Sequence, residues 1–445
     1  MRKSSALCLT LFWTFSFASG IGFAGEYFSI EYPPSSQSEG LIYGVKFTVW
    51  IPEGDPPLRG VIVHQHGCGE GACKSGENAA YDLQWQTLAR KWNCALMGPS
   101  YRQPDKADCR KWCDPRNGSA QAFLNGLHDL AVQSGRPELE QVPWCLWGHS
   151  GGAFWSSLMQ TLYPERIVAI WLRSGTAFYA WDSGEIPLPQ LTQESLSVPM
   201  ISNPGVKEEG DKQFGRIWSG SMQMLQEYRQ RDALLGFAPD PLSGHDCRGS
   251  RVLAIRFFET CLAARLPEPG EDPRSLKPMP IETAWYARPM SDRADPAPRF
   301  EGALPEGTWL PDQKFAEAWS EYVKTGDVTD VTPGEAPTEV TMKSLPDGIV
   351  ELTWNATADL ESGLSGFKIL RNGKEVGAVD PAKESPIGVH RWQALSFHDT
   401  PTIAEPELKW IDRNPDSGSG EYQVMSINGA GLKSIPSKIG NPYRE

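Results

Sequence analysis

A serine lies between glycines in the stretch GHSGG, residues 148–152. A serine hydroxyl is a weak nucleophile at neutral pH unless a base takes its proton and backbone donors stabilise the resulting oxyanion. The pattern Gly-X-Ser-X-Gly lets a strand turn sharply into a helix and lifts the serine out of the sheet, because glycine has no β-carbon to clash. Ser150 is therefore the candidate nucleophile, and the alternative is an ordinary tight turn.

The candidate base is His245. It lies in the loop PLSGHDC, between a predicted strand and a predicted helix, and such loops at the carboxyl ends of strands carry the sites of α/β proteins. His64 and His66 are the other histidines near the predicted sheet that remain possible. The rest are less suitable, because they lie in a helix, beside the serine, or far along the chain: His128, His149, His390 and His398.

An acid must orient the base, and it should lie between the serine and the histidine in sequence. The loop NPGVKEEGD follows the predicted strand at 198–202 and contains three acidic residues. Glu208 is the first choice, and Asp211 and Glu209 come next. Asp182 is the alternative outside this loop.

Two backbone amides are candidates for an oxyanion hole. One is the N–H of Gly151, directly after the nucleophile. The other is the N–H of Cys68, in the glycine-rich loop HQHGCGEG that follows the predicted strand at 61–63. A rival hypothesis makes the Cys68 thiol the nucleophile.

Short apolar runs alternate with helical patterns through the first 265 residues. The predicted strands are 41–51, 61–63, 95–97, 144–147, 167–172, 198–202 and 234–237, and the predicted helices are 81–92, 123–130, 154–162, 221–233 and 252–262. This alternation predicts a mostly parallel, doubly wound α/β sheet covered by helices on both faces. Ser150 would then lie between a strand and an amphipathic helix, as the motif requires.

The rest of the chain changes character twice. Residues 266–332 form a proline-rich connecting segment with a short helix at 314–324. From residue 333 to 445 there are alternating strands such as 349–354, 366–371 and 422–427, and the last two are each followed by an Asn-Gly turn, which predicts a small β-sandwich. Residues 25–265 would be the catalytic domain.

The first 24 residues have the pattern of a secretory signal: Arg2 and Lys3, an apolar run, then small residues before a cleavage site near Ala24. We therefore expect a secreted or periplasmic protein. Cleavage would leave an even number of cysteines, which favours disulfides of unassigned connectivity; they are Cys68, Cys73, Cys94, Cys109, Cys113, Cys145, Cys247 and Cys261. The pairs 68/73 and 109/113 are close enough for local loops.

The net charge of −13 makes a nucleic-acid partner improbable and argues against binding to an anionic membrane. No segment after the signal is long and apolar enough to span a bilayer. The cysteines and histidines lack metal-ligand spacing, and the expected chemistry needs no metal or cofactor. Seventeen tryptophans could suggest sugar stacking, but most fall in predicted strands and helices, where core packing is expected.

Taken together, GHSGG, HGCG and GHDC occur in an order that resembles the α/β-hydrolase fold superfamily over about residues 40–265. The His-Gly-Cys loop looks like that of secreted polyester depolymerases and feruloyl-esterase-like carbohydrate esterases, which places an oxyanion amide at Cys68. The family's acid aligns with Glu208, where many members have aspartate. The segments LTW at 352–354 and Tyr422 with NGAG resemble fibronectin type III.

These resemblances imply a secreted serine hydrolase that cleaves carboxylic esters through an acyl-enzyme, with plant or microbial polysaccharide esters and polyesters as candidate substrates. Two alternatives remain open. One is a secreted serine peptidase on the same fold. The other is a catalytically inactive binding or adhesion protein that acts through its fibronectin-like domain.

Overall fold

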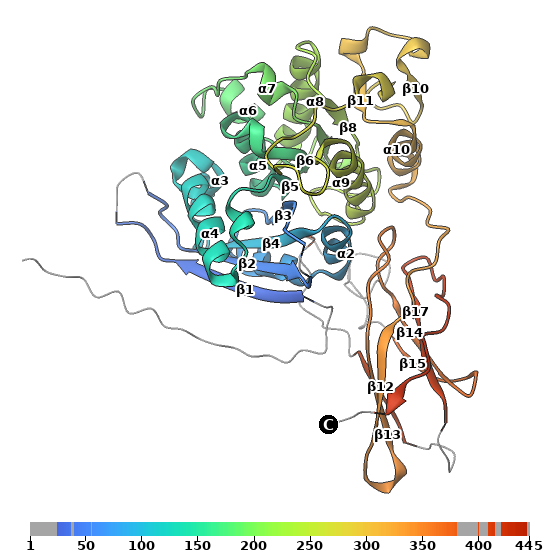
Figure 1. Cartoon of the computed structure of the whole chain (residues 1–445). Coiled ribbons are helices and arrows are strands. Elements are labelled where there is room, and N and C mark those ends of the chain that lie inside the picture. The colour runs from blue at the N-terminus through green and yellow to red at the C-terminus, as the bar shows by residue number, and fades with distance from the viewer. Residues whose placement is uncertain are drawn as a thin grey trace, which may run out of the picture.

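The computed structural model describes residues 25–36, 40–54, 56–380, 399, 408–413 and 420–442. The predicted signal peptide, His390 and His398 lie outside these residues. The main feature is an eight-stranded sheet in the order β1-β2-β4-β3-β5-β6-β7-β8 (Figure 1). Its strands are β1 (Gly25–Tyr32), β2 (Val45–Pro52), β3 (Gly60–Gln65), β4 (Cys94–Tyr101), β5 (Trp144–His149), β6 (Ile167–Arg173), β7 (Met200–Asn203) and β8 (Leu235–Phe237).

Strands β3 to β8 run parallel to one another, whereas β1 and β2 are antiparallel additions at one edge. The carboxyl ends of the parallel strands therefore meet at one edge of the sheet, where the predicted site loops begin. The expected mostly parallel α/β sheet is confirmed. Strand β1 was not predicted from the sequence, because its residues directly follow the signal-like segment.

Both faces of the sheet are buried, as the alternation along β5 shows. Trp144 and Leu146 pack into one apolar core with the helices α4 (Ser119–Ser134), α5 (Gly151–Leu162) and α8 (Gly215–Arg229). Cys145 and Trp147 pack into a second core with α2 (Leu83–Lys91), α9 (Arg251–Arg265) and α10 (Gln313–Thr325). A strand buried on both sides can be apolar at every position, which explains the uninterrupted runs in the sequence.

Shorter helices complete the loops between strands; they are α1 (Glu70–Ser75), α3 (Arg110–Cys113), α6 (Phe178–Asp182) and α7 (Gln193–Leu196). Several predicted boundaries were wrong, and two of them have an identifiable cause. Strand β4 continues through Pro99, because beyond Met97 it pairs only with β2, and a proline is tolerated where one side of the strand is free. Helix α8 begins at Gly215 and not at 221, because Asp211 accepts backbone hydrogen bonds that start the chain turning at Phe214.

The proline-rich segment is ordered against the sheet. It forms a three-stranded sheet of β9 (Trp285–Ala287), β10 (Ala294–Pro296) and β11 (Thr308–Leu310). The Phe237 amide of β8 donates to the Thr308 hydroxyl, and the Trp319 indole of α10 donates to the Phe237 carbonyl at 2.8 Å. The segment therefore covers the edge of the sheet next to β8.

Residues 338–442 contain two small sheets. One has the order β16-β13-β12-β18 and the other β15-β14-β17. The strands are β12 (Thr338–Ser344), β13 (Val350–Asn355), β14 (Gly366–Arg371), β15 (Lys374–Val379), β16 (Lys409–Asp412), β17 (Tyr422–Ile427) and β18 (Asn441–Pro442). Leu352 and Trp354 of one sheet share a core with Phe367, Ile369 and Val424 of the other. The small all-β unit is present, and its fibronectin type III character stays a prediction.

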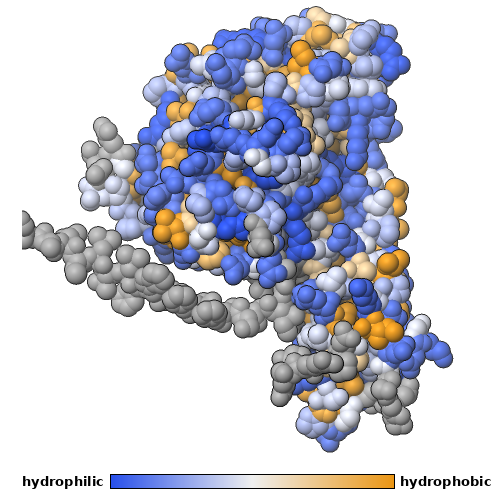
Figure 2. Space-filling view, in the orientation of Figure 1, coloured by the Kyte–Doolittle hydropathy of each residue, from blue (hydrophilic) through white to orange (hydrophobic). Residues whose placement is uncertain are grey.

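Of the fifteen tryptophans that the structure describes, ten are fully buried, which favours packing over sugar stacking for them. They are Trp50, Trp85, Trp112, Trp144, Trp147, Trp155, Trp171, Trp309, Trp319 and Trp354. On the face drawn in Figure 2, hydrophilic residues cover most of the surface, and hydrophobic residues occur in small separate groups. Among the described residues, no helix has both the length and the apolar character needed to cross a membrane.

A buried charge cluster joins the C-terminal part of the chain to the main sheet. The Arg251 guanidinium of α9 pairs with Asp82 and Asp399, each at 2.7 Å. Asp399 also contacts His64 of β3 at 3.0 Å and accepts from the Trp85 indole at 3.2 Å. Burial alone would raise the pKa of Asp399, but Arg251 and His64 outweigh it and hold the pKa below its ordinary value.

The first testable prediction concerns this cluster. Arg251→Met leaves two carboxylates buried without their cation, so we expect the free energy of unfolding to fall by about 3–5 kcal/mol. Chemical denaturation monitored by tryptophan fluorescence measures the change. Arg256→Met on the same helix is the matched control, since Arg256 pairs with Glu361 at 3.8 Å and its loss should cost about 1 kcal/mol. Equal losses in the two variants would contradict the prediction.

Candidate active site

Ser150 lies at the turn from β5 into α5 with a backbone conformation that L-residues rarely adopt, φ 54° and ψ −113°. Such a conformation costs about 1–3 kcal/mol and persists only where the surroundings impose it. The Ser150 amide donates to the Arg173 carbonyl at 2.9 Å, and the Ser150 carbonyl accepts from the Phe154 amide at 3.0 Å. A β-carbon on Gly148 would lie 2.3 Å from the Gly152 carbonyl oxygen, so the turn requires glycine there.

The structure brings together the three side chains that were the first choices from sequence. His245 Nε2 accepts from the Ser150 hydroxyl at 2.9 Å, and its Nδ1 donates to Glu208 Oε1 at 2.6 Å. Glu208 is 1% exposed and His245 9% exposed. These residues follow β5, β7 and β8, so the parallel sheet places them at one edge although they are far apart in sequence.

The alternative acids lie elsewhere. Asp182 accepts from Gln223 at 2.9 Å, and Glu209 is exposed. The Asp211 carboxylate accepts the backbone N–H groups of Phe214 and Gln213, both at 2.8 Å, and these bonds lower its pKa. Which acid contacts His245 depends on the direction in which each side chain points, and the sequence does not show this direction. Glu208 turns inward in a short 3₁₀ turn, Val206–Glu208, where its second oxygen accepts from the Gly205 amide at 3.2 Å.

The other candidate bases have structural partners. His64 is fully buried, stacks on Trp147 with 4.0 Å between ring centroids, and contacts Asp399. His66 accepts from the Tyr101 amide through Nε2 at 3.2 Å, so its Nδ1 carries the proton that is donated to the Gly67 carbonyl at 2.7 Å.

The contact between His66 and Gly67 orients the candidate oxyanion loop. Since the Gly67 carbonyl points back to His66, the Cys68 N–H of the same trans peptide points the opposite way. A β-carbon on Gly151 would lie 2.3 Å from the Cys68 sulfur and 3.4 Å from the Cys68 nitrogen, so Cys68 lies against the residue that follows Ser150. The Gly151 amide also belongs to the first turn of α5, where N–H groups lack helical partners.

A disulfide fastens this loop, and it corrects the cysteine predictions. Cys68 is bonded to Cys109, 41 residues later, and not to Cys73. This bond leaves Cys68 without a thiol, which contradicts its role as a rival nucleophile. The other predicted disulfide cysteines are free and buried, where a thiol packs as a small apolar group; they are Cys73, Cys94, Cys113, Cys145, Cys247 and Cys261.

Cys113 lies beside the disulfide. Its sulfur and those of Cys68 and Cys109 are all within 4.8 Å of one another. Burial raises the pKa of the Cys113 thiol well above its ordinary value, so it stays protonated at neutral pH. With two of the three sulfurs joined to each other, this group is not a ready set of thiolate ligands for a metal.

Arg173 is a supporting residue that sequence reasoning missed. It ends β6, its side chain is fully buried, and it donates to the Asn203 carbonyl at 2.9 Å. Its guanidinium also binds the carbonyls of Gly244 and Asp246, one on each side of His245. Burial alone would lower the pKa of Arg173, but the Asp240 carboxylate outweighs it, and the pKa is raised. The sequence signal that could have identified Arg173 is an arginine at the end of an otherwise apolar strand.

Two further residues hold His245, the candidate base. His149 Nε2 donates to the His245 carbonyl at 2.7 Å. The Phe214 ring lies flat against the His245 imidazole, with 3.8 Å between centroids and 6° between planes. Neither contact was predicted, because both depend on which way a side chain turns.

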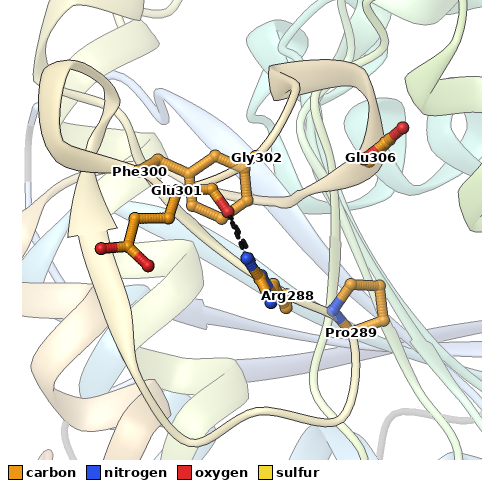
Figure 3. Close-up of a pocket in the computed structure, with 6 residues that line it drawn as sticks. All are labelled: Arg288, Pro289, Phe300, Glu301, Gly302 and Glu306. Atoms are coloured by element: carbon orange, nitrogen blue, oxygen red, sulfur yellow. Dashed lines mark hydrogen bonds between the residues drawn. The ribbon is translucent and has the colours of Figure 1, made fainter.

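A recess of about 360 Å³ lies away from these residues, in the proline-rich segment (Figure 3). It is lined by Arg288, Pro289, Phe300, Glu301, Gly302 and Glu306. The Arg288 guanidinium in its wall donates to the Glu301 carbonyl at 2.7 Å. This bond joins residues 288–289 to residues 300–306, the two stretches of chain that line the recess, so Arg288 stabilises the local structure.

No protein-family model and no curated protein matches the chain. Among solved structures, it is similar to the fluorophosphonate-binding serine hydrolase FphF of Staphylococcus aureus, with 14% identity and a TM-score of 0.33 over 50% of this chain and 92% of that one. An S-formylglutathione hydrolase of Agrobacterium tumefaciens is 13% identical, with a TM-score of 0.33 over 49% and 86% of the two chains. A ferulic acid esterase is 11% identical, with a TM-score of 0.34 over 50% and 93%. Similarities this low transfer no activity to this chain.

The arrangement predicts that Ser150 reacts with a fluorophosphonate. We expect one adduct per chain, mapped to Ser150 by peptide mass spectrometry. His245→Asn should slow the labelling by about 10²- to 10⁴-fold, because it removes the base. Ser219→Ala on α8 is the control and should label like the wild type. Labelling at another serine, or an undiminished rate in His245→Asn, would count against the arrangement.

The disulfide predicts a second outcome in the same assay. Replacing Cys109 and Cys113 together by alanine frees Cys68 and prevents a substitute disulfide. We expect labelling to slow by about 10- to 100-fold, less than the loss of a whole oxyanion donor, because the amide is loosened and not removed. Cys113→Ala alone keeps the disulfide and should react at the wild-type rate. If the double variant reacts as fast as this control, the disulfide does not hold the Cys68 amide in place.

Proposed function

We propose that this protein is a serine hydrolase that cleaves carboxylic esters. The observation that carries the proposal is the continuous line of hydrogen bonds from Ser150 through His245 to Glu208, at 2.9 and 2.6 Å. Each contact matches a role: nucleophile to base, and base to orienting acid. Ser150 also lies at the strand-to-helix turn that exposes such a nucleophile.

In the proposed reaction, Ser150 Oγ attacks the ester carbonyl while its proton passes to His245 Nε2. Glu208 holds Nδ1–H and so fixes the tautomer in which Nε2 is free to accept. The negative charge that develops on the carbonyl oxygen is stabilised by the amides of Gly151 and Cys68. His245 then gives the proton to the leaving alkoxide, which departs as an alcohol and leaves an acyl group on Ser150.

Water completes the cycle. His245 accepts a proton from a water molecule as it attacks the acyl carbonyl, and the returning proton releases Ser150 and the carboxylic acid. Every step uses protein groups and water, so the proposal includes no metal and no cofactor.

Export is a second part of the proposal. The signal-like pattern of residues 1–24 lies outside the described residues, but the Cys68–Cys109 disulfide supports an oxidising compartment, where such bonds persist. We place the catalytic domain at residues 25–265, the connecting segment at 266–332 and a fibronectin type III-like domain at 333–445. The substrate would be an ester, with polysaccharide-linked and polymeric esters as the first candidates.

Hydrolysis of p-nitrophenyl acetate and butyrate, set beside aminoacyl p-nitroanilides, tests the activity. We expect turnover of the esters, and a fall in kcat/KM of about 10³- to 10⁴-fold in Glu208→Gln, because the base loses its orienting charge. Ser150→Ala should abolish turnover. Asp182→Asn is the matched acidic control and should stay near wild type.

The outcomes separate the alternatives. Cleavage of the anilides in preference to esters would indicate a peptidase. No Ser150-dependent turnover of either class would support an inactive binding protein. A panel of feruloyl, acetylated-sugar, glucuronoyl and polyester substrates then identifies the acyl and alcohol groups.

A further inference from the structure

We propose that Phe214 is a positioning residue that stabilises the protonated form of His245 during the reaction, a role that rests on the proposed function. Phe214 is the residue before α8, and it belongs neither to the Ser–His–acid line nor to the oxyanion loop. Its ring lies parallel to the imidazole, with centroids 3.8 Å apart and planes 6° apart. The faces of the two rings are therefore nearly parallel and in contact.

The strength of this contact depends on whether the imidazole is neutral or protonated. Two neutral rings disfavour a face-to-face arrangement, because the negative faces of their π-systems repel. A cation over the same aromatic face is attracted to it. His245 is neutral when Ser150 begins its attack and positively charged once it holds the proton. The contact therefore improves as the transition state forms, which is the kind of interaction that raises kcat.

The backbone of this region shows that the ring is held in place. The Asp211 carboxylate accepts the Phe214 amide at 2.8 Å, and this bond fixes the turn from which the ring projects. His149 also holds the His245 carbonyl at 2.7 Å, and Glu208 holds Nδ1 at 2.6 Å. The imidazole is thus fixed at its edge by hydrogen bonds and on one face by Phe214.

Other charged and titratable groups also act on His245, and the test must leave them in place. Glu208 and Ser150 contact its ring nitrogens, and the His149 ring lies 5.1 Å away. Asp211 interacts electrostatically with the imidazole, and Arg173 binds the neighbouring carbonyls. Asp246 and Arg248 follow in the same loop and pair with each other at 3.1 Å. Substitution at 214 changes none of these side chains.

The test is the pH dependence of ester hydrolysis by Phe214→Leu, which keeps an apolar side chain but removes the aromatic face. We expect kcat on the pH plateau to fall by about two- to thirtyfold, with KM little changed. Because the imidazolium becomes harder to form, the acidic limb of the kcat profile should move to lower pH by about 0.4–1.5 units. A role in packing alone would lower kcat without moving the limb in this direction.

Pentafluorophenylalanine at position 214 gives the sharper comparison, since it keeps the ring shape and reverses the charge of its face. It should lower kcat and move the limb to lower pH at least as far as Phe214→Leu does, whereas Phe214→Tyr should restore both. A pentafluorophenylalanine enzyme with the wild-type profile would overturn the proposal, even if Phe214→Leu fails to fold. Wild-type turnover that depends on Ser150 establishes the proposed function separately, so the two hypotheses can fail independently.

Discussion

The candidate site depends most on the hydrogen bonds of one buried residue, Arg173. The Arg173 carbonyl binds the Ser150 amide at 2.9 Å, while its guanidinium binds Asn203 at the end of β7 and the carbonyls on both sides of His245. One residue at the end of β6 is therefore bonded to the turn at Ser150 and to the loop that carries His245. A fully buried cation is tolerated because these oxygens and the Asp240 carboxylate replace its hydration.

The other residues of the candidate site are also held in fixed positions. Ser150 is kept in an unfavourable backbone conformation, Glu208 is turned inward and 1% exposed, and the His245 ring is contacted at both nitrogens and on one face. Electrostatic interactions are stronger where water is excluded, so a fixed and buried arrangement suits the proposed proton transfers.

Contacts with two distant parts of the chain hold the candidate oxyanion loop. The disulfide to Cys109 holds Cys68 from one side. At the carboxyl end of β3, just before the loop, His64 stacks on Trp147 and contacts Asp399 from the C-terminal part of the chain. Gln84 and Thr87 of α2 also donate to the carbonyls of Leu360 and Ala358 at 3.1 and 3.0 Å. The C-terminal sheets are thus joined to the main sheet near the strand that carries the loop.

The sequence by itself determined the elements and the order of the site segments. Apolar runs and helical periodicity depend on local composition, so they identified most of β2 to β8 and the helices that cover them. The pattern GHSGG marked the turn at Ser150 because its glycines are needed where the backbone approaches itself closely. For the same reason, HGCG and GHDC could be assigned to loops at strand ends.

Tertiary structure decided everything that depends on side-chain direction and on contacts across long stretches of chain. Only the fold shows that Glu208, and not Asp211, turns toward His245, and that Cys68 pairs with Cys109 while six buried cysteines stay free. The same holds for Arg173, Phe214 and Asp399, whose partners lie 30 to more than 300 residues away. Pattern and propensity are local, whereas these pairings are set when the helices and sheets pack together.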